Sequence, residues 1–227
     1  MANSILVIAD SGTGKSTSVR HLNPDETFLI NIANKPLPFK GWKSQYKQIS
    51  KENPKGNLAT ASSAQGIMKA ISHVNDKMPH IKTLVVDDWQ YMSSFEYFDR
   101  ANEKGYDKFT QIAANLAMVA KLPKDLRDDL TVIFLTHSED STDINGNRKI
   151  KAKTIGKMID NTLTLEGLFS IVLFGKVNKN DDGELEYGFE TQNNGENTCK
   201  SPQGMFDDFF IPNNLQYVKD CIQKYEE

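Results

Sequence analysis

The segment "IADSGTGKST" at residues 8–17 constrains the fold more than any other part of this chain. It follows the phosphate-loop pattern G-x-x-x-x-G-K-[ST], except that Ala9 stands where the first glycine belongs. The apolar run 4–9 before it predicts a buried strand, and residues 14–22 after it predict a helix that stops before Pro24. This strand–loop–helix context indicates an α/β fold that binds a nucleotide. The alternative is a glycine-rich turn with a chance lysine.

The residue types in this loop suit phosphate binding. Glycines let successive backbone N–H groups approach a phosphate, and the two nearest the lysine, Gly12 and Gly14, are present. Lys15 is expected to reach the β- and γ-phosphates, and Ser16 to bind Mg²⁺. Alanine at position 9 removes no ligand, but its methyl group must fit where the chain leaves the strand. We therefore expect ATP to contact Ser11, Gly12, Thr13, Gly14, Lys15, Ser16 and Thr17.

Two adjacent carboxylates end the apolar strand predicted at residues 83–89. Asp87 stands where a second carboxylate would hold Mg²⁺ through water. Asp88 is a candidate general base that orients the attacking water, although its side chain is one methylene shorter than the glutamate common there. The alternative for Asp88 is a cap of the next turn, and Glu139 is the rival base.

A further polar pair, Thr136 and His137, ends the strand predicted at residues 131–137. Ligands of open parallel sheets sit at the carboxyl ends of the strands. These two side chains are therefore candidates to sense the γ-phosphate. An ordinary polar strand end explains them equally well.

The order of elements predicts one domain over residues 1–227. Strand and helix alternate as far as residue 137, which indicates a parallel sheet with crossover helices. A long basic excursion over 34–60 interrupts this alternation, and hairpin signals then dominate residues 140–210, which predicts added antiparallel strands. The remaining expected elements are strands at 27–33, 169–177 and 185–192, helices at 63–76, 107–121 and 213–225, hairpin turns at 144–147 and Asp182-Gly183, and caps at Ser62 or Ser63 and at Asn213.

The composition excludes several classes of protein. No apolar run approaches the ~20 residues of a membrane-spanning helix, and no secretory signal is recognisable. Cys199 and Cys221 form no spaced framework, so we expect free thiols and a cytoplasmic location. The histidines lack metal-ligand spacing, which argues against a zinc site.

Four segments together resemble a known family: "ADSGTGKST", "TLVVDDWQ", "FLTHSED" and "TQNNGENTCKSPQGMF". The chain is similar over most of its length to phage-encoded RecA/RadA-like ATPases of single-strand annealing recombination, which are usually labelled AAA or ATP-binding proteins. The resemblance implies a RecA-like core whose fourth strand lies between the phosphate-loop strand and the Asp87 strand. It also implies ATP and Mg²⁺, homo-oligomers with ATP at subunit interfaces, and the host cytoplasm for a phage-encoded chain. Lys200 is a candidate cation acting on a neighbour's γ-phosphate, and the alternative is a solvated loop lysine.

The sequence departs from the RecA pattern in one respect. RecA-type proteins often carry a catalytic glutamate just after the second strand, and here that region reads "NIANKPLPFKG". The identity of the general base is therefore open.

Local basic patches are candidates for contacts with single-stranded DNA, although the net charge is −3. The excursion interleaves its lysines with Phe39, Trp42 and Tyr46, and the alternative is that these aromatics pack on the domain. The second patch has no aromatic residue and would contact phosphates. The candidate DNA-binding residues are Lys40, Trp42, Lys43, Arg148, Lys149, Lys151, Lys153 and Lys157.

These features favour a DNA-dependent ATPase that acts on single-stranded DNA in recombination or annealing, with a single-strand binding protein as a candidate partner. A non-catalytic mediator that binds ATP is the main alternative. A small-molecule kinase is less favoured, because such kinases clamp phosphates with several lid arginines and only Arg148 follows residue 137.

Overall fold

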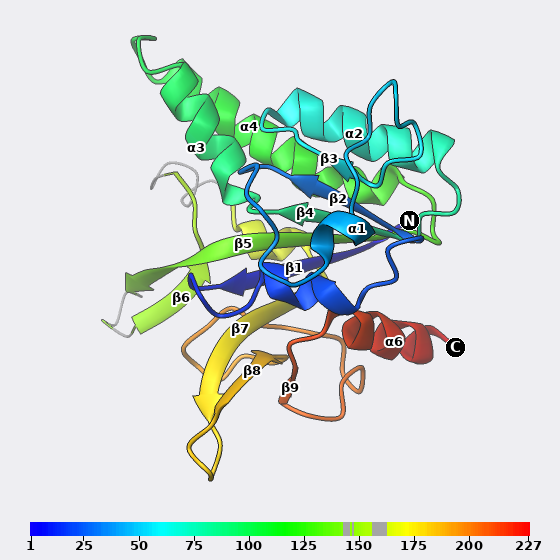
Figure 1. The fold of residues 1–227 in the computed structure, drawn as a ribbon. Helices are drawn as coiled ribbons and strands as arrows, with labels where there is room; N and C mark the ends of the chain where they lie inside the picture. Colours follow the sequence, from blue (N-terminus) through cyan, green and yellow to red (C-terminus); the bar gives the residue numbers. More distant parts are fainter. Residues whose placement is uncertain (143–145, 147, 156–162) are drawn as a thin grey trace.

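A mostly parallel β-sheet forms the centre of the molecule (Figure 1). The computed structural model describes residues 1–142, 146, 148–155 and 163–227. The strand order is β3-β2-β4-β5-β1-β7-β8-β9, with β6 paired to β5. The strands are β1 (Asn3–Ala9), β2 (Thr27–Asn31), β3 (Leu58–Ala59), β4 (Thr83–Asp87), β5 (Thr131–Thr142), β6 (Arg148–Ala152), β7 (Ile171–Lys179), β8 (Leu185–Glu190) and β9 (Phe210–Pro212).

The strand order confirms the predicted mostly parallel sheet with added antiparallel strands. β5 lies between β1 and β4, as the family resemblance implied, and these three strands run parallel. β7 is parallel to β1, whereas β8 and β9 extend the sheet in the antiparallel sense. The carboxyl ends of β1, β4 and β5 therefore lie next to one another.

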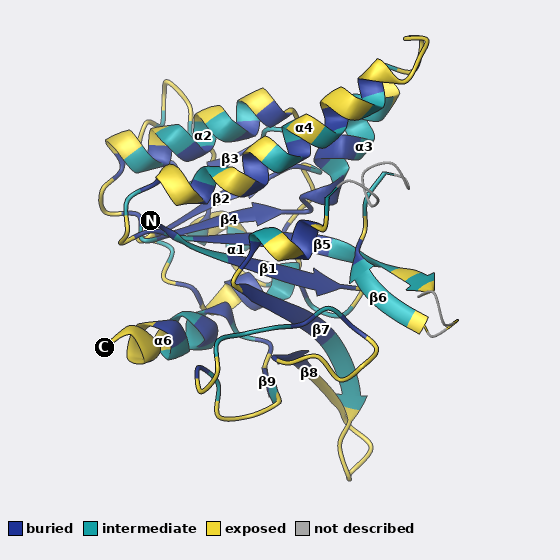
Figure 2. Ribbon diagram, turned by 180° about the vertical axis from the view of Figure 1, so that it is seen from behind, coloured by how far each residue is buried: buried dark blue, intermediate teal, exposed yellow. Residues whose placement is uncertain are grey.

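Helices cover both faces of the sheet. They are α1 (Trp42–Gln45), α2 (Ala64–Lys77), α3 (Gln90–Asp99), α4 (Asp107–Lys121) and α6 (Leu215–Glu226), with short 3₁₀ helices η1 (Ser16–His21), η2 (Leu122–Asp125) and η3 (Leu165–Leu168). Figure 2 shows α2 and α4 buried on the side facing the sheet and exposed on the outer side. None of the helices in the described ranges is long and apolar enough to cross a membrane.

The side chains of each buried strand pack alternately into two hydrophobic cores, one on each face of the sheet. In β1, Leu6 and Ile8 pack into the core beneath α2, α3 and α4. Ile5 and Val7 pack into the core on the opposite face, beneath η1 and α6. All four are at most 1% exposed, which explains why the central strands read as continuous apolar runs rather than alternating patterns.

Three local predictions need correction. The stretch after the phosphate loop is the short 3₁₀ helix η1, because Ser and Thr residues favour helix poorly and the Ser18 hydroxyl bonds back to the Lys15 carbonyl. Helix α3 was not predicted. The cap of α6 is Asn214, not Asn213, since its side chain accepts hydrogen bonds from the N–H groups of Gln216 and Tyr217.

The excursion over residues 34–60 is mostly irregular, as predicted. It contains the single turn α1 and returns to the sheet edge as β3, which pairs with β2. The hairpin signal at residues 144–147 lies almost wholly outside the described residues. The second hairpin turn forms between β7 and β8, with Gly183 at a positive φ of 78°.

Candidate nucleotide-binding site

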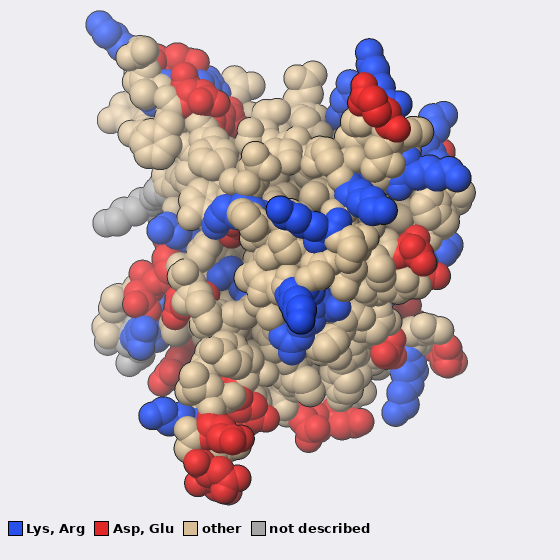
Figure 3. Space-filling model, viewed as in Figure 1, with Lys and Arg blue, Asp and Glu red and all other residues tan. Residues whose placement is uncertain are grey.

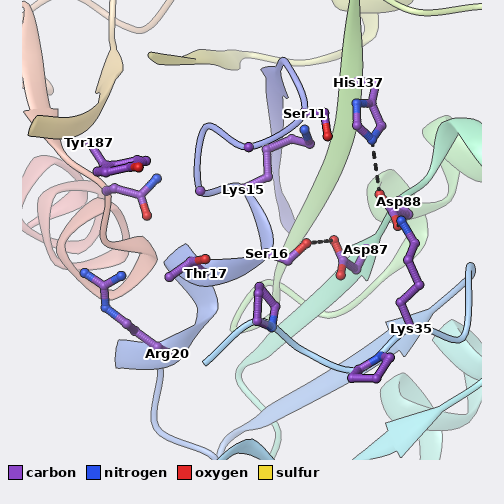
Figure 4. A pocket seen from close by; sticks show the side chains of 15 residues that line it. Ser11, Lys15, Ser16, Thr17, Arg20, Lys35, Asp87, Asp88, His137 and Tyr187 are labelled. Atoms are coloured by element: carbon purple, nitrogen blue, oxygen red, sulfur yellow. Dashed lines mark hydrogen bonds and ion pairs between the residues drawn. The ribbon is translucent and has the colours of Figure 1, made fainter. Parts of the chain in front are cut away.

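A cavity of about 620 Å³ opens at the carboxyl ends of β1, β4 and β5 (Figure 4). This is where ligands bind in open α/β sheets. Six of the seven residues expected to contact ATP line the cavity, as do Asp87, Asp88 and His137; Thr13 is the one that does not. The full set is Ser11, Gly12, Gly14, Lys15, Ser16, Thr17, Arg20, Lys35, Pro36, Pro38, Asp87, Asp88, His137, Tyr187 and Asn213.

The phosphate loop has the backbone that its glycines permit. Gly12 and Gly14 have positive φ angles of 83° and 88°, which are strained for L-residues with side chains. Lys15 is 6% exposed, and its Nζ donates hydrogen bonds of 2.8 Å to the Ala9 and Asp10 carbonyls. Burial lowers the pKa of Lys15 to about 8, although the nearby carboxylates oppose this shift. An added phosphate would stabilise its charged form.

Ala9 fits at the first loop position because of a neighbouring glycine. It is fully buried at the end of β1, and its register partner in β7 is Gly175. A Cβ atom placed on Gly175 would lie only 2.7 Å from the Ala9 Cβ. The methyl group of Ala9 therefore occupies space that a side chain at position 175 would otherwise fill.

Ser16 and Asp87 come together as the sequence predicts for a magnesium site. The Ser16 hydroxyl donates a 2.9 Å hydrogen bond to the Asp87 carboxylate. Burial, with a contribution from the charge of Asp88, raises the pKa of Asp87 to about 6. No described part of the chain holds a metal-binding group of three His, Cys, Asp or Glu residues. A hydroxyl and one carboxylate suit Mg²⁺, which takes its other ligands from water and nucleotide phosphates.

Asp88 faces the cavity in a constrained conformation. Its φ is 59°, in the left-handed region that aspartate tolerates better than most residues. Its carboxylate pairs with the Lys35 ammonium at 2.6 Å and lies 3.5 Å from the His137 Nε2. Burial alone would raise the pKa of Asp88, but the hydrogen bonds from His137 and Lys35 outweigh it and lower the pKa to about 2.

Lys35 is a site residue that sequence reasoning missed. It follows β2, and its Nζ also lies 5.2 Å from the centre of the Tyr91 ring. Figure 4 shows its side chain reaching toward Asp88. The available signal was its position after a parallel strand, where side chains meet at the ligand-binding edge. A cation therefore stands in the region where RecA-type proteins often carry a glutamate.

Three of the predicted catalytic residues do not line the cavity. Glu139 pairs with Lys151 at 3.2 Å, so its role as the base stays a prediction that this geometry does not favour. Thr136 is buried, and its hydroxyl donates to the Gln90 side chain at 3.4 Å. Lys200 exchanges backbone hydrogen bonds with Val172. Its action on a neighbouring subunit stays a prediction.

The second basic patch is largely paired within the chain. Arg148 pairs with Asp140 at 2.8 Å, and the Lys149 Nζ donates a 2.6 Å hydrogen bond to the Gly195 carbonyl. Lys153 forms a backbone hydrogen bond to His137, and Lys157 lies outside the described residues.

The aromatics of the excursion pack on the domain, as the alternative interpretation held. Tyr46 is 2% exposed, and Phe39 and Trp42 lie partly buried against the second core. Phe39 also meets Tyr46 edge-on, with ring centres 6.4 Å apart. Neither Phe39 nor Tyr46 is therefore free to stack on a base.

A family model described as an AAA domain matches residues 1–203, which is most of the chain. No curated protein matches the sequence of this chain.

Proposed function

Because the chain belongs to the AAA domain family, a family of nucleotide-binding ATPase domains, we propose that it is a Mg²⁺-dependent ATPase that acts on single-stranded DNA in recombination or annealing. The hydrogen bond between Ser16 and Asp87 is the observation that carries the ATPase part. It joins the loop hydroxyl to the only carboxylate of β4, at the end of the cavity where the loop would hold phosphates. A glycine-rich turn without function gives no reason for this pairing.

Different residues of the chain have different roles in the proposed ATP hydrolysis. The backbone N–H groups of the loop bind the phosphates, and Lys15 exchanges its two carbonyl partners for phosphate oxygens. Ser16 and Asp87 would hold Mg²⁺, which would supply positive charge to stabilise the negative charge that develops on the transferring phosphate. Asp88, held by Lys35 and His137, accepts a hydrogen bond from the attacking water and orients it.

ATP hydrolysis with and without single-stranded DNA tests this proposal. We expect DNA-stimulated turnover in the wild type, and a loss of about 100-fold or more in Lys15→Ala, which removes the phosphate contact. Asp88→Asn should lose a similar factor, whereas Glu139→Gln, as the matched control, should keep most of the activity.

The other outcomes also discriminate. Turnover that is indifferent to DNA would remove the DNA part of the proposal. ATP binding without turnover would favour the non-catalytic mediator. Loss of activity in Glu139→Gln but not in Asp88→Asn would exchange the roles of the two carboxylates.

A basic band next to the cavity supports the DNA part. Lys40, Lys43 and Lys47 are exposed, and within the described part of the chain none of them forms an ion pair. Figure 3 shows basic side chains spread across the face that carries α1, whereas the β7–β8 tip is acidic. Because no carboxylate pairs with these lysines in the described residues, they are better placed to meet phosphates than the paired cations of β6.

A triple alanine variant at Lys40, Lys43 and Lys47 tests this surface. We expect weaker binding of single-stranded DNA and a salt slope reduced by about two, at ~0.7 for each lost phosphate contact. The matched control replaces three exposed lysines of α2 and α4 with alanine: Lys69, Lys77 and Lys121. Equal affinities and slopes in both variants would place the DNA elsewhere.

Assembly into homo-oligomers with ATP at the interfaces completes the proposal. It rests on the family resemblance and on Lys200, which would need to act on a neighbour because it does not line its own cavity. Sedimentation with ATP, with DNA and without either checks assembly. A monomer under all three conditions would contradict it.

A further inference from the structure

The cavity continues beyond the residues that the phosphates need. Figure 4 shows Tyr187 and Arg20 at one end and Lys35, Asp88 and His137 at the other, with Lys15 and Ser16 between them. Asn213 also lines the cavity. Its backbone N–H donates a 3.1 Å hydrogen bond to the Tyr187 carbonyl, so the two residues form one wall.

The Asn213 side chain is buried without partners. The residue is 4% exposed, and neither its Nδ2 nor its Oδ1 forms a hydrogen bond with any described residue. Burying an amide in this way costs free energy unless something else binds it. Native structures rarely leave both atoms of a buried amide unpaired, so the arrangement points to a ligand.

The amide is also placed directly against the phosphate loop. A Cβ atom on Gly14 would lie 3.2 Å from the Asn213 Nδ2 and 3.3 Å from its Oδ1. A nucleotide whose phosphates occupy the loop would therefore bring its nucleoside part to this wall. Tyr187, 42% exposed, offers an aromatic ring there.

We propose that Tyr187 and Asn213 form a base-binding subsite that selects a purine, and adenine over guanine. The proposal rests on the proposed function, namely that the loop holds a nucleoside triphosphate. Tyr187 stacks on the base, because aromatic rings bind the faces of bases and purines offer the larger face. Asn213 donates to one atom of the base edge and accepts from another. An amide matches the paired acceptor and donor of adenine in this way.

Direct binding of ATP, GTP and CTP tests the subsite, measured by calorimetry with Mg²⁺ present. We expect the wild type to prefer ATP, and Asn213→Ala to lose about tenfold in affinity for ATP and much less for CTP. Asn213→Asp should shift the ratio toward GTP, because a carboxylate accepts from the two adjacent N–H donors of guanine. Tyr187→Ala should weaken purine binding about tenfold, and Tyr187→Phe, which keeps the ring, should restore it.

The controls separate this subsite from the proposed function. Lys15→Ala should weaken all three nucleotides without changing their order. A wild type that binds no nucleotide would overturn both proposals. Equal affinity for ATP, GTP and CTP, or an equal loss for all three in Asn213→Ala, would overturn the subsite alone. Unfolding in urea should show Asn213→Ala at least as stable as the wild type, since no intramolecular hydrogen bond is removed; a marked loss of stability would make Asn213 structural and contradict the proposal.

Discussion

Adjacent residues at the end of β4 have opposite electrostatic environments. Asp87 points into a buried space beside Ser16, where little compensates for the loss of water, and its pKa rises. Asp88 has a left-handed backbone that turns its carboxylate toward Lys35 and His137, and its pKa falls. The two neighbours can therefore serve different purposes, one as a metal ligand and the other as a charged group that orients water.

The raised pKa of Asp87 predicts a pH-dependent cost to stability. The folded protein binds this proton more tightly than the unfolded chain, whose pKa is near 3.8. The resulting stabilisation is complete below about pH 4 and is lost as pH rises through about 6. The neutral variant Asp87→Asn should therefore raise the free energy of unfolding by about 1–3 kcal/mol at pH 8, and by much less at pH 4.

Urea unfolding of metal-free protein at the two pH values measures this difference. The matched control is Asp129→Asn, because the hydrogen bond from Lys82 lowers the pKa of Asp129 and its variant should lose stability at pH 8. The same gain for Asp87→Asn at both pH values would contradict the assignment of a raised pKa.

At the scale of elements, β1 and β7 explain how an unusual phosphate loop is tolerated. The residue that replaces the first glycine keeps ordinary strand geometry and packs against Gly175 across the parallel pair. Ala9, which departs from the phosphate-loop pattern, thus packs against a residue that lies about 165 residues later in the chain. The backbone carbonyl of Ala9, which would be the same if glycine stood there, accepts a hydrogen bond from Lys15.

This pairing predicts compensation between two substitutions. Gly175→Ala should destabilise the protein by about 1–3 kcal/mol, because its new Cβ would meet Ala9 at 2.7 Å. Ala9→Gly alone should cost about 0.5–1 kcal/mol through chain entropy. The double variant should be more stable than Gly175→Ala, and urea unfolding of all four proteins forms the cycle that measures the coupling. Strictly additive effects would show that the two residues do not compete for space.

At the scale of the whole molecule, the C-terminal segment completes the fold beyond the AAA match. The match ends at residue 203, yet β9 extends the sheet and α6 covers its second core. The connection between them places Asn213 in the cavity. The segment therefore contributes both to stability and to the proposed base-binding subsite.

Paired substitutions on α6 test its structural part. Leu215 is fully buried in the second core, whereas Tyr225 on the same helix is 48% exposed. Leu215→Ala should lower the free energy of unfolding by about 2–5 kcal/mol. Tyr225→Ala should change it by less than about 0.5 kcal/mol. Similar urea midpoints for the two variants would mean that α6 does not complete the core.

The sequence by itself determined the central strands and the phosphate half of the site. Continuous apolar runs are the signature of strands buried on both faces, and a phosphate loop is local in sequence, so its residues could be assigned without the fold. The sequence also predicted that Ser16 and Asp87 lie close together, because the carboxyl ends of neighbouring parallel strands meet at one edge of the sheet.

Only the tertiary structure decided the rest of the site. Lys35 reaches Asp88 from an irregular excursion, and Asn213 and Tyr187 approach the loop from antiparallel additions. Glu139, the rival base in the sequence, does not line the cavity and pairs with Lys151. Such contacts depend on how distant segments fold back on the sheet. Local hydrophobic periodicity and motif spacing in the sequence do not predict these contacts. The same reason explains Ala9, whose fit depends on a glycine in another strand.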